Sequence, residues 1–554
     1  MGSMAMKNLD GRLIIAGERV ETQEKIKVEN PATLEILGEV CLASSQDGQR
    51  AVEAARAAFH SWRSLAFRQK QEIFKAAKEI LWRRAEEIAR LITLEKGSPL
   101  VESLAVEVLG ILETLDYYSR HQPDSLRPRK APVHVPFFAH KKNRFLFQPL
   151  GPTLVISPWN FPFLLSASDV ISALAAGNTV ILRPSTSTPF CALAIGEIFL
   201  EAGLPPGVLN VVPCRVTQAE ELILNPLIQC LLFTGSVATG KRIMELASRN
   251  LTSLVLELGG KDPMIVLEDA DVDMTARGAV WAGFMNTGQS CASVERIYVA
   301  AKIAPAFIER VVALTKALKL GNPIEPEVDF GPMENSSQRK VVEEHVQEAV
   351  AKGAEVLYGG KKWSGLPGYF YEPTVLINVD HSMKIMKEET FGPVLPIMTF
   401  DSLEQAIALA NDSVYGLTAS VWTRNPEKAA RVAEQLEAGT VTINDHMFSA
   451  TEPRAIWGGI KQTGLGRSHG PYGLLELVNI KYVSADFSGK EDRIWWYPYS
   501  LNKYELLQES LNLLHGRRFQ QKVKALFSLS SRMKAVRAGL PLSSLLRTLS
   551  RLLH

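Results

Sequence analysis

One of the five cysteines lies in a polar, glycine-containing loop whose composition would suit thiol chemistry. The loop runs from Asn286 to Cys291 and ends just before an apolar run at 296–300. A nucleophilic thiol must be reachable by its substrate, so Gly288 and the polar residues around it favour a reactive role for Cys291 over a buried structural one. The remaining cysteines are expected to be structural: Cys41, Cys191, Cys214 and Cys230.

Glu257 is a candidate general base. It lies among apolar residues at the end of a strand-like run, and a pair of glycines begins two residues later. Partial desolvation of a carboxyl group raises its pKa towards the range useful for proton transfer near neutral pH. The alternative is an ordinary glutamate that pairs with Lys261 or caps a helix.

Asn160 is a candidate oxyanion donor. It lies in Ser157–Pro162, a turn that two prolines stiffen directly after a strand-like run. A neutral amide placed there can donate a hydrogen bond to a developing oxyanion, an interaction typically worth about 2.7–4 kcal/mol. On its own, an asparagine in a turn is more often explained by turn geometry.

A fourth segment could hold an anion. Phe233–Gly240 follows a strand-like run and opens a helix, so its backbone N–H groups and the helix N-terminus would face a phosphate. The segment matches neither Gly-x-Gly-x-x-Gly nor the phosphate-binding loop of nucleotide hydrolases, because the spacing after its first glycine differs.

These segments need a scaffold, and the surrounding sequence predicts a doubly wound α/β sheet. Short apolar runs alternate with helix-length segments, which is typical of buried parallel strands covered by helices. The first series has expected strands at Thr153–Ser157, Thr179–Leu182, Val208–Val212, Ile228–Phe233 and Ser253–Leu256. A second series has expected strands at Met264–Leu267, Arg296–Ala300, Glu355–Leu357, Val394–Thr399, Ala419–Trp422 and Thr440–Ile443.

Two other regions have different patterns. Residues 45–120 carry apolar residues at a helical period. Residues 132–148 alternate apolar and polar residues around a turn at 141–143, which predicts a β-hairpin that could project and pair. The apolar positions of that hairpin are Val133, Val135, Phe137, Phe145 and Phe147.

The composition excludes several classes of protein. The 554 residues are 46% apolar and 22% charged, with a formal charge of +2. These values exclude collagen-like, disordered and disulfide-scaffold proteins and give no reason to expect nucleic-acid binding. No signal-peptide pattern opens the chain, prolines interrupt its most apolar stretch at 151–182, and its cysteines are few and widely spaced. We therefore expect a cytoplasmic protein.

Taken together and in this order, the segments resemble the aldehyde dehydrogenase superfamily from about residue 10 to residue 484. The 34-residue step from Glu257 to Cys291 is also similar to that of the family. The matching segments are 158–162, 233–240, 257–261, 288–291, 389–393, 411–416 and 458–467. The resemblance implies an α/β, aldehyde dehydrogenase-like fold with two doubly wound α/β domains and a β-hairpin oligomerisation arm.

The resemblance also implies a reaction and the residues that perform it. Cys291 would attack the carbonyl carbon of an aldehyde, and Asn160 would hold the oxyanion. After hydride transfer to NAD or NADP, Glu257 would activate the water that hydrolyses the thioester to a carboxylic acid. The implied cofactor contacts are Ile156, Ser157, Pro158, Trp159, Arg183, Ser185, Thr186, Gly235, Ser236, Thr239, Leu258, Gly259, Glu389 and Phe391. No metal is expected.

The sequence departs from the family at Arg183 and Thr186. Most members have a lysine at the first position and often a glutamate at the second, where the carboxylate binds the adenine ribose. Threonine cannot repel a 2′-phosphate, and arginine can pair with one in a bidentate way. We therefore expect NADP to be at least tolerated.

The expected substrate tunnel is apolar. Its predicted lining residues are Phe161, Leu165, Ser168, Met285, Ser290, Met447 and Phe448. An apolar wall disfavours charged aldehydes, because a carboxylate would lose its hydration without gaining a partner. We predict medium- or long-chain aliphatic or aromatic aldehydes. The alternative is an anionic semialdehyde, which His446 or Arg454 could bind.

The last seventy residues extend beyond the resemblance. From Lys503 onwards the chain has ten Lys or Arg and two acidic residues, and an aromatic cluster, 495–499, precedes this stretch. A basic amphipathic tail could make peripheral contact with an anionic membrane, and packing on the enzyme body or a neighbouring subunit is the alternative. The leucines expected on one helical face are Leu542, Leu545, Leu546, Leu549, Leu552 and Leu553.

These expectations divide the chain into four parts. We expect a dinucleotide-binding domain at 1–130 and 150–259, an oligomerisation arm at 131–149 and 471–484, a catalytic domain at 260–470, and a basic amphipathic helical extension at 485–554. The expected assembly is a homodimer or homotetramer. A non-catalytic structural or binding protein of the same fold is a further alternative, but it predicts loss of the thiol, base or amide, and all three are present.

Overall fold

The computed structural model describes residues 10–135, 138–489 and 493–535. Contacts divide the chain into two compact units. Of the described residues, those up to Leu126 together with Gln148–Asn479 form the first unit. Arg127–Phe147 and the described residues from Ile480 onwards form the second unit.

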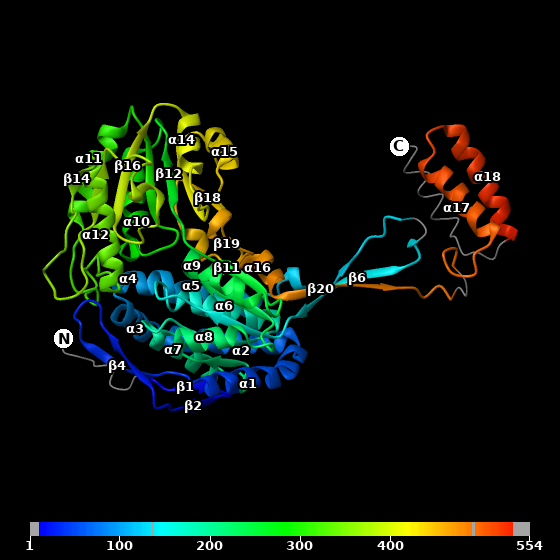
Figure 1. Cartoon of the computed structure of the whole chain (residues 1–554), viewed down its shortest axis with the longest axis horizontal. Helices are drawn as coiled ribbons and strands as arrows, with labels where there is room; N and C mark the ends of the chain where they lie inside the picture. The colour runs from blue at the N-terminus through cyan, green and yellow to red at the C-terminus, as the bar shows by residue number, and fades with distance from the viewer. Residues whose placement is uncertain (1–9, 136–137, 490–492, 536–554) are drawn as a thin grey trace. The chain divides into compact units, whose positions relative to one another are not determined.

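The first unit contains an eight-stranded sheet in the order β19-β11-β10-β7-β8-β9-β1-β2 (Figure 1). Its five central strands run parallel, and antiparallel strands close both edges. The parallel strands are β7 (Pro152–Ile156), β8 (Thr179–Arg183), β9 (Leu209–Val211), β10 (Cys230–Thr234) and β11 (Ser253–Glu257). The edge strands are β1 (Leu13–Ile15), β2 (Glu18–Val20) and β19 (Gly464–Leu465). This arrangement confirms the predicted doubly wound sheet.

A second sheet has seven strands in the order β14-β15-β16-β13-β12-β17-β18. Its strands are β12 (Asp262–Val266), β13 (Val294–Ala300), β14 (Glu355–Tyr358), β15 (Thr374–Ile377), β16 (Val394–Phe400), β17 (Thr418–Trp422) and β18 (Thr440–Ile443). All pairs are parallel except β14 with β15. The sequence did not predict β15, because its four residues follow Pro373 without a recognisable period. A small antiparallel pair, β3 (Lys25–Glu29) with β4 (Ile36–Cys41), also lies in the first unit.

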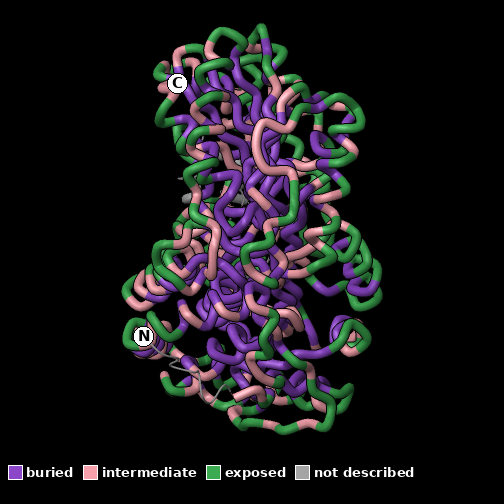
Figure 2. The backbone as a smooth tube through the Cα atoms, turned by 90° about the vertical axis from the view of Figure 1, so that its left-hand side faces the viewer, coloured by how far each residue is buried: buried purple, intermediate pink, exposed green. Residues whose placement is uncertain are grey.

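Helices alternate with the strands of both large sheets along the chain. Buried residues gather in the interior, and exposed residues lie on the outside (Figure 2). The helices before β12 are α1 (Ser45–Ser64), α2 (Phe67–Arg83), α3 (Ala85–Lys96), α4 (Leu100–Glu102), α5 (Leu109–Arg120), α6 (Leu164–Ala176), α7 (Pro189–Glu201), α8 (Val216–Ile223) and α9 (Val237–Ala247). Those after it are α10 (Val272–Phe284), α11 (Ala304–Ala317), α12 (Ser336–Ala351), α13 (Lys384–Lys387), α14 (Leu403–Asn411), α15 (Pro426–Gln435) and α16 (Gly470–Glu476). A π-helical turn, Ser103–Val108, joins α4 to α5.

The arm is a three-stranded sheet in the order β20-β6-β5, formed by β5 (Arg129–Lys130), β6 (Lys142–Pro149) and β20 (Val478–Ala485). The predicted bounds of its hairpin were wrong. Val133 and Val135 lie in a long connection, and Phe137 lies outside the described residues. The first strand is instead the two-residue β5, which pairs with residues 144–145. Alternation over a few residues cannot distinguish an extended loop from a strand, because only a strand also has a hydrogen-bonded neighbour.

Two helices follow the arm in the second unit: α17 (Leu501–His515) and α18 (Phe519–Ala535). They pack together around a small apolar core of Ile494, Leu506, Leu513, Ala525 and Leu529. The predicted leucine face at 542–553 lies outside the described residues. Within the helices that the structure describes, none is long and apolar enough to cross a membrane.

Candidate active site

The loop before Cys291 has an unusual backbone. Asn286, Thr287 and Gly288 follow α10 with φ angles of 56°, 59° and 69°, which is the left-handed region. Such a conformation costs free energy for residues other than glycine and persists only where surrounding contacts enforce it. At Gly288 a Cβ atom would lie 2.3 Å from the carbonyl oxygen of Gly392, so the backbones approach too closely for a side chain.

Buried polar side chains from the α3–α4 region hold this loop. The Asn286 N–H donates to Glu102 Oε2 at 2.8 Å, and Asn286 Oδ1 accepts from Ser98 Oγ at 2.8 Å and from the Lys96 ammonium. Lys96 is fully buried. These anchors fix the course of the chain before Cys291, and sequence analysis missed them because nearly 190 residues separate the partners.

Cys291 is partly exposed and lines two cavities. The first, which we call the apolar cavity, has a volume of about 300 Å³. The second has a volume of about 240 Å³ and lies at the carboxyl ends of the central strands, and we call it the strand-edge cavity. Thr234 also lines both. The thiol therefore stands where a molecule in one cavity could meet a molecule in the other.

Glu257, the last residue of β11, lines the apolar cavity. Both of its carboxylate oxygens are buried, and hydrogen bonding from Ser468 offsets only part of the effect of that burial on the pKa. Burial raises the pKa of Glu257 to about 8, and the nearby Asp169 carboxylate contributes to the shift. A carboxyl group with a pKa in this range can exchange a proton near neutral pH, which is compatible with the predicted role of general base.

Asn160 is buried and lines the strand-edge cavity beside Cys291. The side-chain Nδ2 of Asn160 donates to the backbone carbonyl oxygen of Gln289 at 3.2 Å, and the backbone carbonyl oxygen of Asn160 accepts from Asn286 Nδ2 at 2.8 Å. A primary amide has two N–H donors, so one remains for a ligand at the thiol. Burial raises the pKa of Cys291 well above its ordinary value, with Glu389 as the next cause, so the resting thiol is protonated.

The strand-edge cavity has the features of a dinucleotide site. Gly235 and Ser236 line it where α9 begins, and a helix N-terminus favours an anion such as a pyrophosphate. At Gly259 a Cβ atom would lie 2.5 Å from the Glu389 carboxylate, so the backbone leaves room that a side chain would fill. The predicted residues that line this cavity are Pro158, Trp159, Asn160, Gly235, Ser236, Leu258, Gly259, Glu389 and Phe391. The ring of Trp159 contacts that of Phe391 edge to face at 5.5 Å.

The other predicted cofactor contacts do not line this cavity. Ile156 and Arg183 are register partners at the carboxyl ends of β7 and β8. Arg183 Nη2 donates to the carbonyl oxygen of Cys214 at 2.8 Å, so part of its guanidinium is already engaged. The other hydroxyls pair locally: Ser157 with Ser166, Ser185 with the Ser187 N–H, and Thr239 with Ser236. Thr186 lies partly exposed beyond β8.

A buried ion pair holds the turn that carries Glu389 and Phe391. Lys261 Nζ donates to Glu295 Oε2 at 2.5 Å, and both side chains are almost completely buried. The Glu295 carboxylate also accepts from the N–H groups of Thr390 and Phe391, each at 2.8 Å. The sequence left open a pairing of Lys261 with Glu257, but Lys261 pairs with Glu295 instead.

Replacing Glu295 with glutamine should destabilise the fold, because it leaves the buried Lys261 ammonium without a counter-charge. We expect the free energy of unfolding to fall by about 3–5 kcal/mol. Glu245→Gln is the matched control, since Glu245 is 69% exposed in its pair with Arg242 and should cost at most about 1 kcal/mol. Urea unfolding of the two variants tests this, and equal losses would contradict it.

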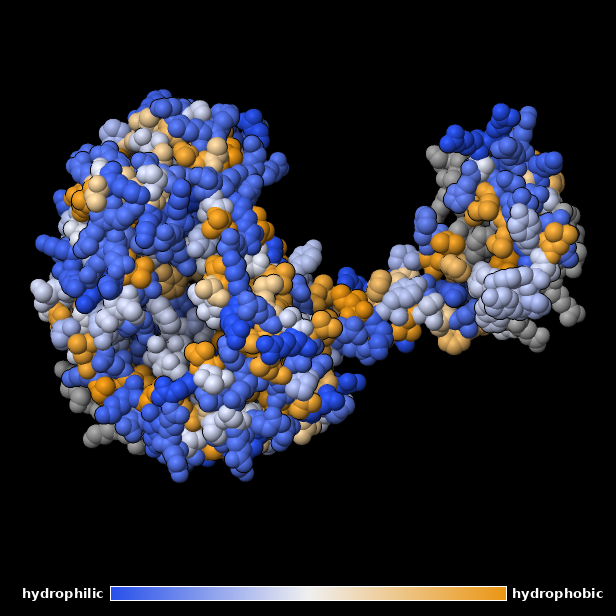
Figure 3. Space-filling view, viewed as in Figure 1, coloured by the Kyte–Doolittle hydropathy of each residue, from blue (hydrophilic) through white to orange (hydrophobic). Residues whose placement is uncertain are grey.

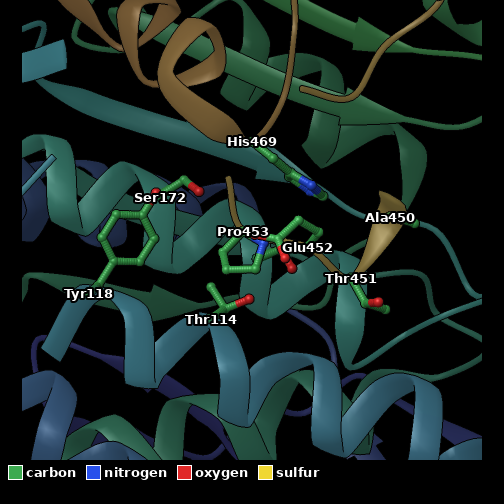
Figure 4. Close-up of a pocket in the computed structure, with 9 residues that line it drawn as sticks. Thr114, Tyr118, Ser172, Ala450, Thr451, Glu452, Pro453 and His469 are labelled. Atoms are coloured by element: carbon green, nitrogen blue, oxygen red, sulfur yellow. The ribbon is translucent and has the colours of Figure 1, made fainter. Parts of the chain in front are cut away.

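The apolar cavity contains most of the predicted substrate residues: Phe161, Leu165, Met285, Ser290 and Met447. Ser168 was wrongly placed there. It lines a separate polar cavity of about 10 Å³, room for roughly one water, with Thr114, Tyr118, Ser172 and His469 among its other walls (Figure 4). The side chain of Phe448 lies outside the described residues.

The helical period of α6 explains why Ser168 does not line the apolar cavity. It also explains why Asp169, which the sequence did not indicate, does line it. Phe161, Leu165 and Asp169 are spaced by four residues at and along α6, and all three line the apolar cavity. Ser168 and Ser172 lie one step around the helix and face the polar cavity instead. Burial raises the pKa of Asp169 to about 7.

Neither predicted partner for an anionic tail lines the apolar cavity. His446 is buried, its Nε2 lies 2.9 Å from the carbonyl oxygen of Ala292, and burial lowers its pKa to about 4. Arg454 is exposed. His469 does line the cavity, but burial lowers its pKa to about 4 as well, so it is neutral at pH 7.

Comparisons with known proteins agree on the family. Residues 19–483 match the model of the aldehyde dehydrogenase family. Mitochondrial succinate-semialdehyde dehydrogenase from Rattus norvegicus is 37% identical over 480 residues, which covers 86% of this chain and 90% of the relative. Glutarate-semialdehyde dehydrogenase from Pseudomonas aeruginosa is 37% identical over 461 residues, with coverage of 83% and 94%.

A comparison with solved structures shows that the fold is also similar. The crystal structure of an E. coli NADP-dependent enzyme superposes with a TM-score of 0.83 at 36% identity, covering 86% of this chain and 98% of that one. Similarity of this extent in sequence and fold means that the chain belongs to the aldehyde dehydrogenase family and is an oxidoreductase that acts on aldehyde groups with NAD or NADP.

Proposed function

We propose that Cys291 is the nucleophile of this enzyme and that the apolar cavity holds the aldehyde. The observation that carries the proposal is the position of the thiol, which lines the apolar cavity and the strand-edge cavity at once. As Sγ bonds to the carbonyl carbon, the thiol proton passes to the Glu257 carboxylate. The free N–H of the Asn160 amide donates to the oxygen that becomes negative.

The second half of the reaction uses Glu257 again. NAD or NADP held in the strand-edge cavity would supply the hydride acceptor, and loss of hydride from the carbon bonded to Cys291 would leave a thioester. Once Glu257 has released its proton, it takes another from a water molecule whose oxygen attacks the thioester carbon. The carbon–sulfur bond then breaks, and the acid leaves.

For the cofactor, we propose that Glu389 binds the nicotinamide ribose and that the N-terminus of α9 faces the pyrophosphate. The lining of the strand-edge cavity supports both roles. Lys261 and Glu295 act as positioning residues for the turn that carries Glu389.

For the substrate, two observations favour different classes. The walls of the apolar cavity support medium- or long-chain aliphatic or aromatic aldehydes, because its described lining residues include no Lys or Arg and do include the carboxyl groups of Asp169 and Glu257. A substrate carboxylate would lose its hydration there without a cationic partner. Similarity favours the second candidate, an anionic semialdehyde, since the relatives above are named for succinate and glutarate semialdehydes. The comparisons therefore support the semialdehyde class better than the apolar class.

A further cavity, next to the apolar cavity, supports substrates whose alkyl chains are too long for the apolar cavity alone. It has a volume of about 520 Å³ and shares Trp281 and Met285 with the apolar cavity. Its walls are largely apolar, with Val280, Phe284 and Leu314 among them. The far end of a long alkyl chain would continue along these walls while its carbonyl lay at Cys291.

A panel of aldehydes separates the two classes. If the walls of the apolar cavity determine substrate preference, hexanal and longer alkanals should have kcat/KM values at least tenfold above that of succinate semialdehyde. Each added methylene should contribute about 0.8 kcal/mol, or about fourfold, until the cavity is full. A strict preference for succinate semialdehyde over hexanal would reject the apolar class and support the anionic one.

NADP should be accepted, because Arg183 and Thr186 offer no carboxylate to repel its 2′-phosphate. Similarity to the NADP-dependent enzyme from E. coli supports this expectation. We expect kcat/KM values for NAD and NADP within about a hundredfold of each other. A discrimination of more than about 2.7 kcal/mol against NADP would contradict the prediction.

We also propose that the arm mediates a homodimer or homotetramer and that the four predicted parts of the chain act as separate domains. Exposed apolar side chains on β20 support the arm's role, since Ile480 is 51% exposed and Tyr482 is 54% exposed on a strand at the edge of its sheet. The five free cysteines support a cytoplasmic location.

A further inference from the structure

Helix α17 carries apolar side chains on two separate sides. Leu506 and Leu513 face the small core that it shares with α18. Leu501, Tyr504, Leu507 and Leu511 are 71%, 62%, 37% and 60% exposed. At about 100° per residue these four positions fall within an arc of about 120°, so they form one exposed stripe.

Helix α18 repeats this arrangement. Ala525 and Leu529 are buried in the shared core, whereas Phe519 and Phe527 are 67% and 71% exposed. Phe519, Val523 and Phe527 are spaced by four residues and share one side of the helix. The core of the helical pair is therefore complete without Phe519 and the exposed stripe of α17, and another partner must explain why these side chains are apolar.

The segment before α17 adds aromatic rings. Trp496, Tyr497 and Tyr499 are 50%, 80% and 66% exposed. The segment is held in place, because Lys503 Nζ donates to the carbonyl oxygen of Trp496 at 2.8 Å and the Arg493 guanidinium lies 5.5 Å from a Trp496 ring centroid. Trp and Tyr are the residues enriched where a membrane meets water, because they combine an apolar ring with a polar group.

Positive charge accompanies these apolar groups. Arg517, Arg518 and Lys524 are exposed and Lys522 is partly exposed at and after the turn between the helices. The chain from Lys503 onwards has ten basic and two acidic residues. Figure 3 shows apolar and hydrophilic side chains interleaved over this unit. A surface that is apolar, aromatic and basic matches an anionic bilayer, which offers acyl chains below a layer of negative headgroups.

We propose that the exposed side chains of α17, α18 and the preceding aromatic segment form a surface that binds the headgroup region of an anionic membrane. The aromatic and leucine side chains enter the interface, and the arginine and lysine side chains pair with lipid phosphates. The helices lie on the membrane and do not cross it. A second copy of the chain is the competing occupant, but it gives no reason for the exposed cations Arg517, Arg518 and Lys524.

Flotation of the full-length protein tests this surface. We expect recovery with vesicles of phosphatidylcholine plus phosphatidylglycerol, little recovery with phosphatidylcholine alone, and release when the salt concentration is raised. Arg517→Gln combined with Arg518→Gln should weaken binding about 30-fold. Leu511→Ser combined with Phe519→Ser should weaken it at least about tenfold.

The control is Asn502→Ala combined with Gln521→Ala, which changes exposed polar residues away from the apolar stripes. This variant should float like the parent protein, and all variants should keep aldehyde oxidation in solution. Equal recovery with and without phosphatidylglycerol would overturn the proposal. So would variants that float like the parent but lose oligomeric mass by light scattering, because that result would place a second copy on this surface.

Discussion

Replacing Cys291 with alanine should lower kcat for aldehyde oxidation by about 10⁴-fold or more, because Cys291 is the only thiol that lines both cavities among the described residues. The fold should be unaffected, since the thiol is partly exposed and the loop is anchored through Asn286 instead. Steady-state NADH production and thermal unfolding measure the two effects separately.

Cys230→Ala is the matched control for that variant. Cys230 is fully buried at the amino end of β10, away from both cavities, and burial raises its pKa to about 12. Its removal should change the melting temperature more than the turnover. If Cys291→Ala kept its turnover, Cys291 would not be the nucleophile, and the same enzyme activity would need a different group.

Replacing Glu257 with glutamine should lower the steady-state rate by about 10²–10⁴-fold, the usual contribution of a general base. Glutamine has nearly the same shape but accepts no proton. Attack by the thiol becomes slower but can still release its proton to water, whereas hydrolysis of the thioester needs Glu257 to activate the attacking water and should suffer most. Rapid mixing with aldehyde and cofactor should therefore show a first turnover followed by a very slow steady state. A variant with an unchanged steady-state rate would contradict the role of Glu257.

The pH dependence of the parent enzyme follows from the same carboxyl group. Glu257 accepts a proton only when ionised, and burial together with Asp169 raises its pKa to about 8. The rate of hydrolysis should therefore rise with pH through about 8 and level off above it. Asp169→Asn removes the neighbouring negative charge, so the rising limb should move to lower pH.

Much of the fold and of the reaction centre could be predicted from the sequence. Buried parallel strands such as β7 and β10 are short apolar runs, so their existence is a local property of the chain. Cys291 and Glu257 were identifiable for a similar reason, because each lies in a short segment whose residue types suit its chemistry. Cys291 lines both cavities, and Glu257 lines the apolar cavity.

The sequence did not indicate several residues whose roles depend on contacts between distant segments of the chain. Lys96 and Glu102 bind the loop before Cys291 from almost 190 residues away. Glu295 looks like an ordinary strand residue until Lys261 and the turn at 390–391 are placed beside it. The error at Ser168 has a different cause, since one residue of rotation along a helix decides which cavity a side chain faces.

The central claim is that a covalent acyl group forms on Cys291 between the two cavities and that Glu257 removes it. The most direct test is mass spectrometry of Glu257→Gln protein after a single exposure to aldehyde and NAD. We predict one acyl group per chain, located on the peptide that contains Cys291, together with one equivalent of NADH. Reduced cofactor formed without an acyl group on Cys291, or an acyl group on another residue, would contradict the mechanism.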